Sequence, residues 1–460
     1  MTRAVTRTVS IEIIPTPSLG DRSYLAHDGE VALVVDPQRD IDRILTLATT
    51  HGVRITHVFE THIHNDYVTG GLALARRTGA AYHVNAEDSV SFERVKVQDG
   101  DVIQVSGTMA VRVIATPGHT LTHLSYALSD GGQEVGVFTG GSLLFGATGR
   151  PDLLGPDHTH ELVRHQYASA HRLAGELPGQ AEVLPTHGFG SFCAAGSTAG
   201  ATESTIARER RENPALTLDQ EEWIARTLAG LDAYPAYYVQ MGLANSSGPR
   251  EAELDRPEPV AKELLADRIR AGEWVVDLRN RTVFAAGHVP GTLNFGLDGQ
   301  FVTYLGWLIP WGTPLTLLGD DAQQVEDAQR ELVRIGIDRL EGAATGEPQD
   351  WTDGGLGHFP VASFADLAQV RHHRPVQVLD VRRDLEFGES HIEGAVSIPL
   401  HQLFSRLDEL PDGEIWVHCA AGYRASIAAS LLSAACRTVV AVDDSFSNAE
   451  PAGLVLSRAA

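Results

Sequence analysis

Cysteine is scarce in this sequence: its 460 residues include only Cys193, Cys419 and Cys436. Three widely spaced cysteines cannot build a disulfide framework, so we expect reduced thiols and a cytoplasmic location. Basic residues are also few, with 36 Lys and Arg against 60 Asp and Glu, which gives a formal charge of −24. That charge opposes binding to nucleic acid or to anionic membranes, and we expect neither as a partner.

Long apolar segments are missing as well. Residues 1–14 lack the apolar core of a signal peptide, and no uninterrupted apolar run is long enough to span a bilayer. Hydrophobic residues still make up 43% of the chain, which is ordinary for a globular protein. At roughly 150 residues per domain, the length predicts about three domains.

Three histidine-bearing turns distinguish the first half of the chain. They are ETHIHNDYVTGG (60–71), TPGHT (116–120) and PTHGFG (185–190), and each follows an apolar run that is typical of a buried strand. A strand fixes the backbone, and the turn after it lets side chains converge on one point. Imidazole and carboxylate are ligands for zinc or iron(II). The candidate metal ligands are His62, His64, Asp66, His119 and His187.

Local patterns predict the surroundings of these turns. Residues 24–37 (YLAHDGEVALVVDP) predict a hairpin that turns at Asp28–Gly29, and residues 41–51 and 70–79 predict helices. Residues 245–259 and 342–357 are rich in Gly, Pro and polar side chains, which is typical of connecting segments.

An internal repeat occupies the second half. Asp277, Arg279, Phe284, His288 and Gly291 recur as Asp380, Arg382, Phe387, His391 and Gly394, each 103 positions further on (380 minus 277). Each copy begins with an apolar strand and continues with a second strand that leads into a helix, which predicts a small parallel sheet. Asp380 and Arg382 are expected to stabilise the domain.

The second copy carries a candidate sulfur site. In EIWVHCAAGYRASIAASLL (414–432) a strand ends at Cys419 and a helix starts near Arg424. Backbone N–H groups at a helix N-terminus favour a thiolate, and an arginine can contact an anionic substrate. Small residues between the two allow a ligand to approach the backbone. The candidate site residues are Cys419, Ala420, Ala421, Gly422, Tyr423 and Arg424. In the first copy, Gly319 or Asp320 stands where the cysteine would be, so we expect a structural or docking role there.

The three histidine turns resemble the metallo-β-lactamase superfamily. That resemblance implies an αββα sandwich, with His62, His64 and His119 at a first metal position and Asp66 and His187 at a second. The chain departs from the family pattern twice. Tyr67 replaces the final histidine of the motif, and Gly141 stands where the bridging aspartate is expected. A two-metal hydrolase site is therefore not expected.

The loop after Cys419 and the segment from Asp380 to Ala395 resemble the rhodanese family. Four residues separate Cys419 from Arg424, whereas cysteine phosphatases have five. The resemblance implies that Cys419 carries sulfane sulfur as a persulfide.

The whole arrangement resembles the persulfide dioxygenase–rhodanese fusion proteins, also through GATGRPDL (146–153). The expected domains are a metallo-β-lactamase-like domain (1–244), a rhodanese-like domain without the cysteine (260–350) and a rhodanese domain (362–460). The resemblance implies one non-haem iron(II), or zinc, no organic cofactor, and Arg150 as a substrate-binding residue. The implied partners are a low-molecular-weight thiol persulfide, thiosulfate or sulfite, and by analogy a second copy of the chain in a homodimer.

The family binds iron through two histidines and one aspartate, which correspond here to His62, His119 and Gly141. Because Gly141 has no side chain, a replacement ligand is required. His64, Asp66 and His187 are the candidates, and Asp66 is the natural one as the acid of the motif loop. Two alternatives stay open: a zinc-dependent thioester hydrolase resembling glyoxalase II, and a sulfurtransferase whose N-terminal domain is a metal-free scaffold.

Overall fold

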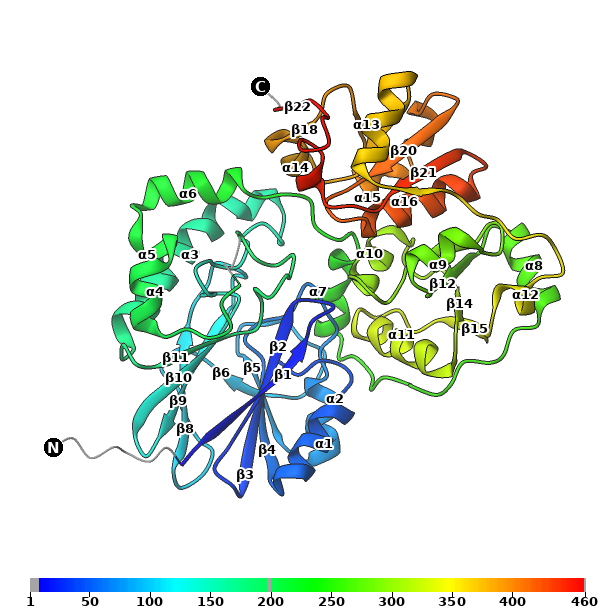
Figure 1. Ribbon diagram of the computed structural model, residues 1–460. Coiled ribbons are helices and arrows are strands. Elements are labelled where there is room, and N and C mark those ends of the chain that lie inside the picture. Colours follow the sequence, from blue (N-terminus) through cyan, green and yellow to red (C-terminus); the bar gives the residue numbers. More distant parts are fainter. Residues whose placement is uncertain (1–7, 197–199, 459–460) are drawn as a thin grey trace. The chain divides into compact units, whose positions relative to one another are not determined.

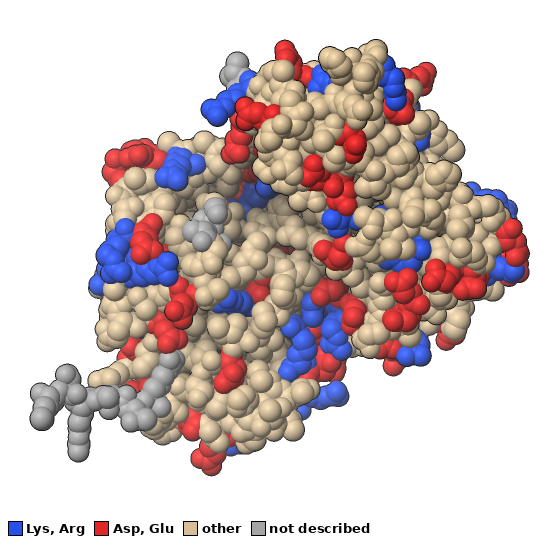
Figure 2. All heavy atoms as spheres, viewed as in Figure 1, with Lys and Arg blue, Asp and Glu red and all other residues tan. Residues whose placement is uncertain are grey.

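The structure is a computed structural model that describes residues 8–196 and 200–458. The chain divides into two compact units. One unit comprises the residues up to Glu253 together with Val333–Gly336, and the other comprises Leu254–Leu332 and the residues from Ile337 onward. Acidic and basic side chains are interspersed on the face drawn in Figure 2.

Two sheets pack face to face in the first unit. The first has the order β1 (Ser10–Thr16), β2 (Asp21–His27), β3 (Val31–Val35), β4 (Arg54–Phe59), β5 (Ala81–Asn85) and β6 (Val95–Val97). The second has the order β11 (Glu182–Pro185), β10 (Gln133–Gly140), β9 (Leu124–Asp130), β8 (Met109–Ala115) and β7 (Val102–Gln104). The predicted hairpin is confirmed, because β2 and β3 pair antiparallel on either side of Asp28–Gly29.

Alternation along the strands builds three layers of core. In β3, Leu33 and Val35 face the second sheet and pack with Val111 and Tyr126, whereas Val34 faces α1 (Asp42–His51) and α2 (Gly71–Thr78). This period of two is what a strand buried on both faces requires. The predicted helices at 41–51 and 70–79 are confirmed.

Helices cover the other face of the second sheet as well (Figure 1). They are α3 (Pro156–Glu176), α4 (Ile206–Glu212), α5 (Pro214–Thr217) and α6 (Gln220–Ala229), and α7 (Tyr238–Ser246) follows. The layers therefore form the expected αββα sandwich.

The second unit contains two small parallel sheets, as expected. The first has the order β13 (Leu293–Asn294), β12 (Trp274–Asp277), β14 (Leu315–Gly319) and β15 (Leu340–Thr345). Its helices are α8 (Lys262–Arg270), α9 (Arg281–Ala286), α10 (Phe301–Leu308), α11 (Ala322–Arg334) and α12 (Pro348–Trp351).

The second sheet repeats this plan. Its order is β16 (Val361–Ala362), β21 (Thr438–Val442), β20 (Glu414–His418), β17 (Gln377–Asp380) and β19 (Val396–Ser397), and all its neighbours are parallel. A separate antiparallel pair joins β18 (His391–Ile392) to β22 (Leu456–Ser457). The helical segments are α13 (Phe364–His373), α14 (Asp384–Glu389), α15 (Leu400–Leu403), η1 (Leu407–Glu409), α16 (Tyr423–Ala434) and η2 (Phe446–Asn448).

One of the two predicted connecting segments differs from expectation. The first, 245–259, begins within the last residues of α7, and its residues 248–258 contain no helix or strand. The second, 342–357, includes most of β15 and all of α12. The reason is a close backbone approach at Gly342, where φ is +148° and an added Cβ would lie 2.7 Å from the Glu258 carbonyl oxygen. Ala343 exchanges backbone hydrogen bonds of 2.9 Å with Glu258 and Val260. Glycine there therefore serves strand pairing and not a flexible connection.

None of the helices among residues 8–196 and 200–458 is long and apolar enough to cross a membrane.

Candidate functional site

Three loops of the sandwich bring histidines into one buried cluster. β4, β8 and β11 each end shortly before a histidine, and the loops that follow carry His62, His119 and His187. The ring centroids lie 4.8 Å apart for His62 and His119, 5.4 Å for His62 and His187, and 5.3 Å for His119 and His187. None of the three residues is more than 2% exposed. The predicted turns therefore meet inside the protein.

Two of these rings are held through Nδ1. His119 Nδ1 lies 2.9 Å from the carbonyl oxygen of Arg150, which can only accept, so this nitrogen carries the proton. His62 Nδ1 lies 2.9 Å from Thr61 Oγ1, and that hydroxyl donates its proton to Asp36 Oδ2 at 2.7 Å. The hydroxyl must therefore accept from His62. Nε2 of both neutral rings therefore carries a lone pair, and Nε2 of His119 has no hydrogen-bond partner among the described residues.

His187 is held by two carboxylates. Its Nδ1 lies 2.9 Å from Asp21 Oδ1 and 3.2 Å from Asp66 Oδ2, while its Nε2 lies 3.4 Å from Nε2 of His62. Burial lowers the pKa of His187, but the charges of Asp66 and Asp21 outweigh it and raise that pKa well above its ordinary value. Burial and the neighbouring Asp66 raise the pKa of Asp21 to about 8. Asp66 thus lies on the Nδ1 side of His187, away from His62.

His64 is anchored through its other nitrogen. Its Nε2 lies 3.2 Å from Glu60 Oε2, 3.3 Å from Asp36 Oδ1 and 3.0 Å from the Tyr67 hydroxyl. Burial lowers the pKa of His64, but the charges of Asp36 and Glu60 overcome it and raise that pKa to about 9. Tyr67, which replaces the last histidine of the motif, stacks on this ring at 4.3 Å between centroids. Its hydroxyl therefore orients a histidine.

The space that a side chain at Gly141 would need is already filled. A Cβ added there would lie 2.6 Å from Cγ of His119, and one added at Gly149 would lie 2.7 Å from Nδ1 of the same ring. Real Cβ atoms do not approach other atoms so closely, because such contacts force neighbouring groups to shift. The two glycines therefore enclose the imidazole of His119. His123 reinforces this arrangement, since its Nε2 accepts the Gly141 N–H at 3.0 Å.

The donor set fits a divalent metal ion. Nε2 of His119 and Nδ1 of His64 are buried and have no hydrogen-bond partner among the described residues. A buried polar atom without a partner is unfavourable, and a cation satisfies an imidazole lone pair. Ligand atoms of His62, His64 and His187 lie within 4.8 Å of one another, as do those of His119, His187 and Cys193. His187 belongs to both groups.

Cys193 also reaches the histidine cluster. The residue is fully buried, and its Sγ lies within 4.8 Å of ring nitrogens of His119 and His187. Burial and the charges of Asp66 and Asp21 raise the pKa of this thiol well above its ordinary value. The thiol form is therefore favoured in the absence of a cation.

Arg150 lies beside the cluster with its guanidinium occupied. It donates to both carboxylate oxygens of Asp152 at 2.7 Å and to the carbonyl of Asp232 at 2.7 Å, and it lies 4.7 Å from the ring centroid of Tyr234. Arg150 is only 4% exposed. Its carbonyl orients His119, so the residue supports the histidine cluster through its backbone, and substrate binding by its side chain stays a prediction.

Sequence reasoning missed the carboxylates behind the histidines. Asp21 begins β2, Asp36 follows β3, and Glu60 follows β4. Asp36 has a φ of +51°, a backbone conformation that is uncommon outside glycine and that often marks a functional turn. The position of an acid directly after a buried strand was the available signal for Asp36 and Glu60.

The sulfur loop has the predicted strand–loop–helix form. β20 ends at His418, Cys419 is 2% exposed, and α16 begins at Tyr423. Gly422 adopts a φ of +89°, and a Cβ there would overlap the carboxylate of Asp443. Glycine is therefore required at the turn that directs the first N–H groups of α16 toward the loop.

The side chain of Arg424 is engaged in an ion pair. Its guanidinium makes a bidentate ion pair with Glu386, with N···O distances of 2.6 and 2.8 Å. Burial raises the pKa of Glu386, but the pair outweighs it and lowers that pKa to about 2. The arginine therefore fixes α14 against the start of α16, and its contact with an anionic substrate stays a prediction.

Two other residues of this loop form hydrogen bonds with residues outside it. The hydroxyl of Tyr423 donates to the Gly296 carbonyl at 2.7 Å, and the Phe446 N–H donates to the Ala420 carbonyl at 2.9 Å. The Tyr423 side chain is thus engaged by the first repeat copy. Substrate contacts at Ala420, Ala421, Gly422 and Tyr423 stay a prediction, and we expect them to come from the backbone.

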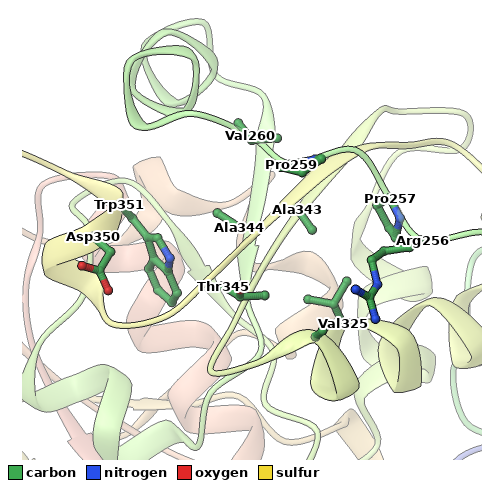
Figure 3. Close-up of a pocket in the computed structure, with 11 residues that line it drawn as sticks. Arg256, Pro257, Pro259, Val260, Val325, Ala343, Ala344, Thr345, Asp350 and Trp351 are labelled. Carbon is green, nitrogen blue, oxygen red and sulfur yellow. The ribbon is translucent and has the colours of Figure 1, made fainter.

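The first repeat copy contains a cavity whose lining differs from that of the sulfur loop (Figure 3). Its volume is about 360 Å³, and it is lined by the segment 256–260, the start of α11, the end of β15, and the side chains of Asp350 and Trp351. Among its lining residues, all of which are described, there is no cysteine or histidine. β14 ends at Gly319 without a nucleophile. Sulfur chemistry is therefore not expected in this copy.

The αββα sandwich with a buried histidine cluster defines a metallo-β-lactamase-fold protein, joined here to a further domain. A family model for the rhodanese-like domain matches residues 363–450. The human mitochondrial persulfide dioxygenase ETHE1 is 30% identical over 207 residues, which is 45% of this chain and 72% of that protein. The chain belongs to the persulfide dioxygenase ETHE1 family, with a rhodanese-like domain in its C-terminal part.

One further relative and one solved structure are also similar to this chain. A hydroxyacylglutathione hydrolase from Synechococcus sp. (strain JA-3-3Ab) is 30% identical over 241 residues, 47% of this chain and 92% of that protein. The crystal structure of a metallo-β-lactamase from Staphylococcus aureus subsp. aureus COL has 27% identity and a TM-score of 0.66, and covers 74% of this chain and 100% of that chain. Its coverage extends beyond the metal-site sandwich.

Proposed function

We propose that this chain is an enzyme of sulfur metabolism with two reaction centres. The histidine cluster oxidises a low-molecular-weight persulfide, and Cys419 transfers sulfane sulfur. The observation that carries this proposal is the joint presence of buried imidazoles with unsatisfied nitrogens and a cysteine in the loop that leads into α16. Membership in the ETHE1 family supports the first activity, and the rhodanese-like match supports the second.

The first reaction is RSSH + O2 + H2O → RSH + sulfite + 2 H⁺. Bound at the cluster, an iron(II) ion would supply oxygen activation. The residues of the chain orient the donors: Thr61, Asp21 and the Arg150 carbonyl fix three imidazoles, and burial of the cluster excludes bulk water. Zinc fits the same nitrogens, but zinc is redox-inactive and would leave oxidation unsupported.

In the second reaction the outer sulfur of a Cys419 persulfide is attacked by sulfite. The S–S bond breaks, thiosulfate leaves, and the Cys419 thiolate keeps the bonding electron pair. Backbone N–H groups at the start of α16 stabilise that thiolate. The reverse direction uses the same loop, so either thiosulfate or a persulfide can load Cys419.

The two activities require separate tests. Full-length protein loaded anaerobically with iron(II) should consume oxygen with glutathione persulfide and form sulfite, whereas His62→Ala should not. Oxygen uptake equal in both proteins would refute the oxidation. Turnover of an acylglutathione thioester by zinc-loaded protein would instead support the hydrolase that the Synechococcus relative suggests.

The sulfur-transfer half has a matched control within the chain. Cys419→Ser should abolish thiosulfate sulfurtransferase activity, because serine cannot form a persulfide. Cys436→Ser should retain it, because Cys436 is exposed and lies beyond the end of α16. Activity that survives in Cys419→Ser would show that another residue carries the sulfur.

A further inference from the structure

Gly141 stands where the family resemblance places the aspartate ligand of the metal. We propose that a metal ion at the histidine cluster is coordinated by imidazole nitrogens alone and that His187 serves as a ligand in place of that aspartate. This inference rests on the proposed metal site, and it specifies the ligand set on which the substrate chemistry depends. Asp66, the acid expected from the sequence, is assigned to orienting His187.

Four imidazoles share one pattern of anchoring. In each ring one nitrogen is held by an oxygen outside the cluster: Thr61 for His62, Glu60 and Asp36 for His64, the Arg150 carbonyl for His119, and Asp21 with Asp66 for His187. The other nitrogen is left for the interior. Metal-binding histidines in proteins are typically held in this way, with an acceptor on the nitrogen that does not bind the metal.

The interior nitrogens lie at ligand-like separations. Nε2 of His62 and Nε2 of His187 are 3.4 Å apart. Two imidazole nitrogens on one tetrahedral ion, each about 2.0–2.1 Å from it, are separated by about 3.3 Å. Ring nitrogens of His187 also lie within 4.8 Å of those of His64 and His119. His187 is therefore the histidine that connects the cluster.

The carboxylates cannot take the inner position without rearrangement. Asp66 and Asp21 contact His187 at Nδ1, and Glu60 and Asp36 contact His64 at Nε2, on the outer sides of both rings. A carboxylate at position 141 is excluded because the ring of His119 fills its place. Two competitors remain: Asp66, whose ligand atom lies within 4.8 Å of those of Asp21 and His187, and Cys193, whose Sγ reaches His119 and His187.

X-ray absorption of the wild-type full-length protein, loaded with one equivalent of zinc, tests the proposal without a substitution. The expected spectrum has a shell of nitrogen or oxygen scatterers with the multiple scattering of at least three imidazoles, and no sulfur. A sulfur scatterer would overturn the proposal in favour of Cys193. Two or fewer imidazoles would overturn it in favour of a carboxylate.

Metal content of variants supplies the second measurement. After chelation and reloading, His187→Gln should lose stoichiometric zinc, whereas Asp66→Asn should keep one equivalent with affinity lower by about 10- to 100-fold. Cys193→Ser and the exposed control His158→Ala should match the wild type. Full zinc occupancy in His187→Gln, or its loss in Cys193→Ser, would overturn the proposal. Zinc binding as expected, without oxygen uptake by the iron-loaded protein, would refute only the proposed oxidation.

Discussion

Gly141→Ala tests whether position 141 has room for a side chain beside His119. The added methyl group would lie 2.6 Å from Cγ of His119, and His119 is fully buried. The imidazole cannot yield easily, because Gly149 closes its other side and the Arg150 carbonyl holds its Nδ1. Overpacking of this kind typically costs about 1–3 kcal/mol.

The expected loss can be measured as a shift in thermal unfolding. In a unit of about 250 residues, 1 kcal/mol corresponds to about 2–4 °C, so the unfolding transition of the first unit should fall by roughly 2–12 °C. The same displacement of His119 should weaken zinc binding. Differential scanning calorimetry of metal-free protein, followed by titration with zinc, separates the two effects.

Gly175→Ala is the matched control. Gly175 lies in α3, and an added Cβ there meets nothing within 4 Å. Alanine should therefore stabilise the helix, by up to about 1 kcal/mol. If Gly141→Ala unfolds at the same temperature as Gly175→Ala and binds zinc as tightly as the wild type, position 141 has room for a side chain and the argument for the replaced carboxylate fails.

Three ion pairs in the second unit give further predictions. Because pairing with Arg424 lowers the pKa of Glu386 to about 2, its stabilising effect should be complete above the ordinary glutamate value near 4.5 and disappear as pH falls toward 2. The difference in unfolding temperature between wild type and Glu386→Gln should therefore narrow between pH 6 and pH 2, and a constant difference would contradict the pairing. Asp277→Asn and Asp380→Asn should each cost about 3–5 kcal/mol in urea unfolding, because each removes one partner of a buried pair with the same 2.6 Å contact to arginine. If the two variants lose clearly different free energies of unfolding, or either loss lies outside this range, the Asp–Arg pair does not stabilise the two copies equally.

Strand-end patterns were enough to predict which loops would meet. An apolar run followed by a Gly-rich turn with a histidine locates His62, His119 and His187, because a buried strand fixes where its last residue lies. The hairpin at Asp28–Gly29 and the loop after Cys419 were predictable for a similar reason. The residues that favour a turn or begin a helix are neighbours in the sequence.

Contacts between distant residues could not be predicted in this way. Asp21 is 166 positions from His187, and Glu386 is 38 positions from Arg424, so no local pattern connects them. The sequence consequently favoured Asp66 as the replacement ligand, because it is the nearest acid to the motif. Only the three-dimensional arrangement places Asp66 behind His187.

At both candidate centres, carboxylates contact and orient the side chains of the site. At the metal site, carboxylates lie behind imidazoles, and at the sulfur site Glu386 lies behind Arg424. Persulfides, sulfite and thiosulfate carry negative charge, and two like charges about 4 Å apart repel by roughly 4 kcal/mol at an effective dielectric constant of 20. Removing the carboxylate at position 141 lowers this repulsion where the proposed substrate reacts, while the acids that remain still orient the groups that contact it. An acid at position 141 would displace His119 and restore this repulsion, so Gly141→Asp should weaken both zinc binding and persulfide binding, which titration with each ligand measures.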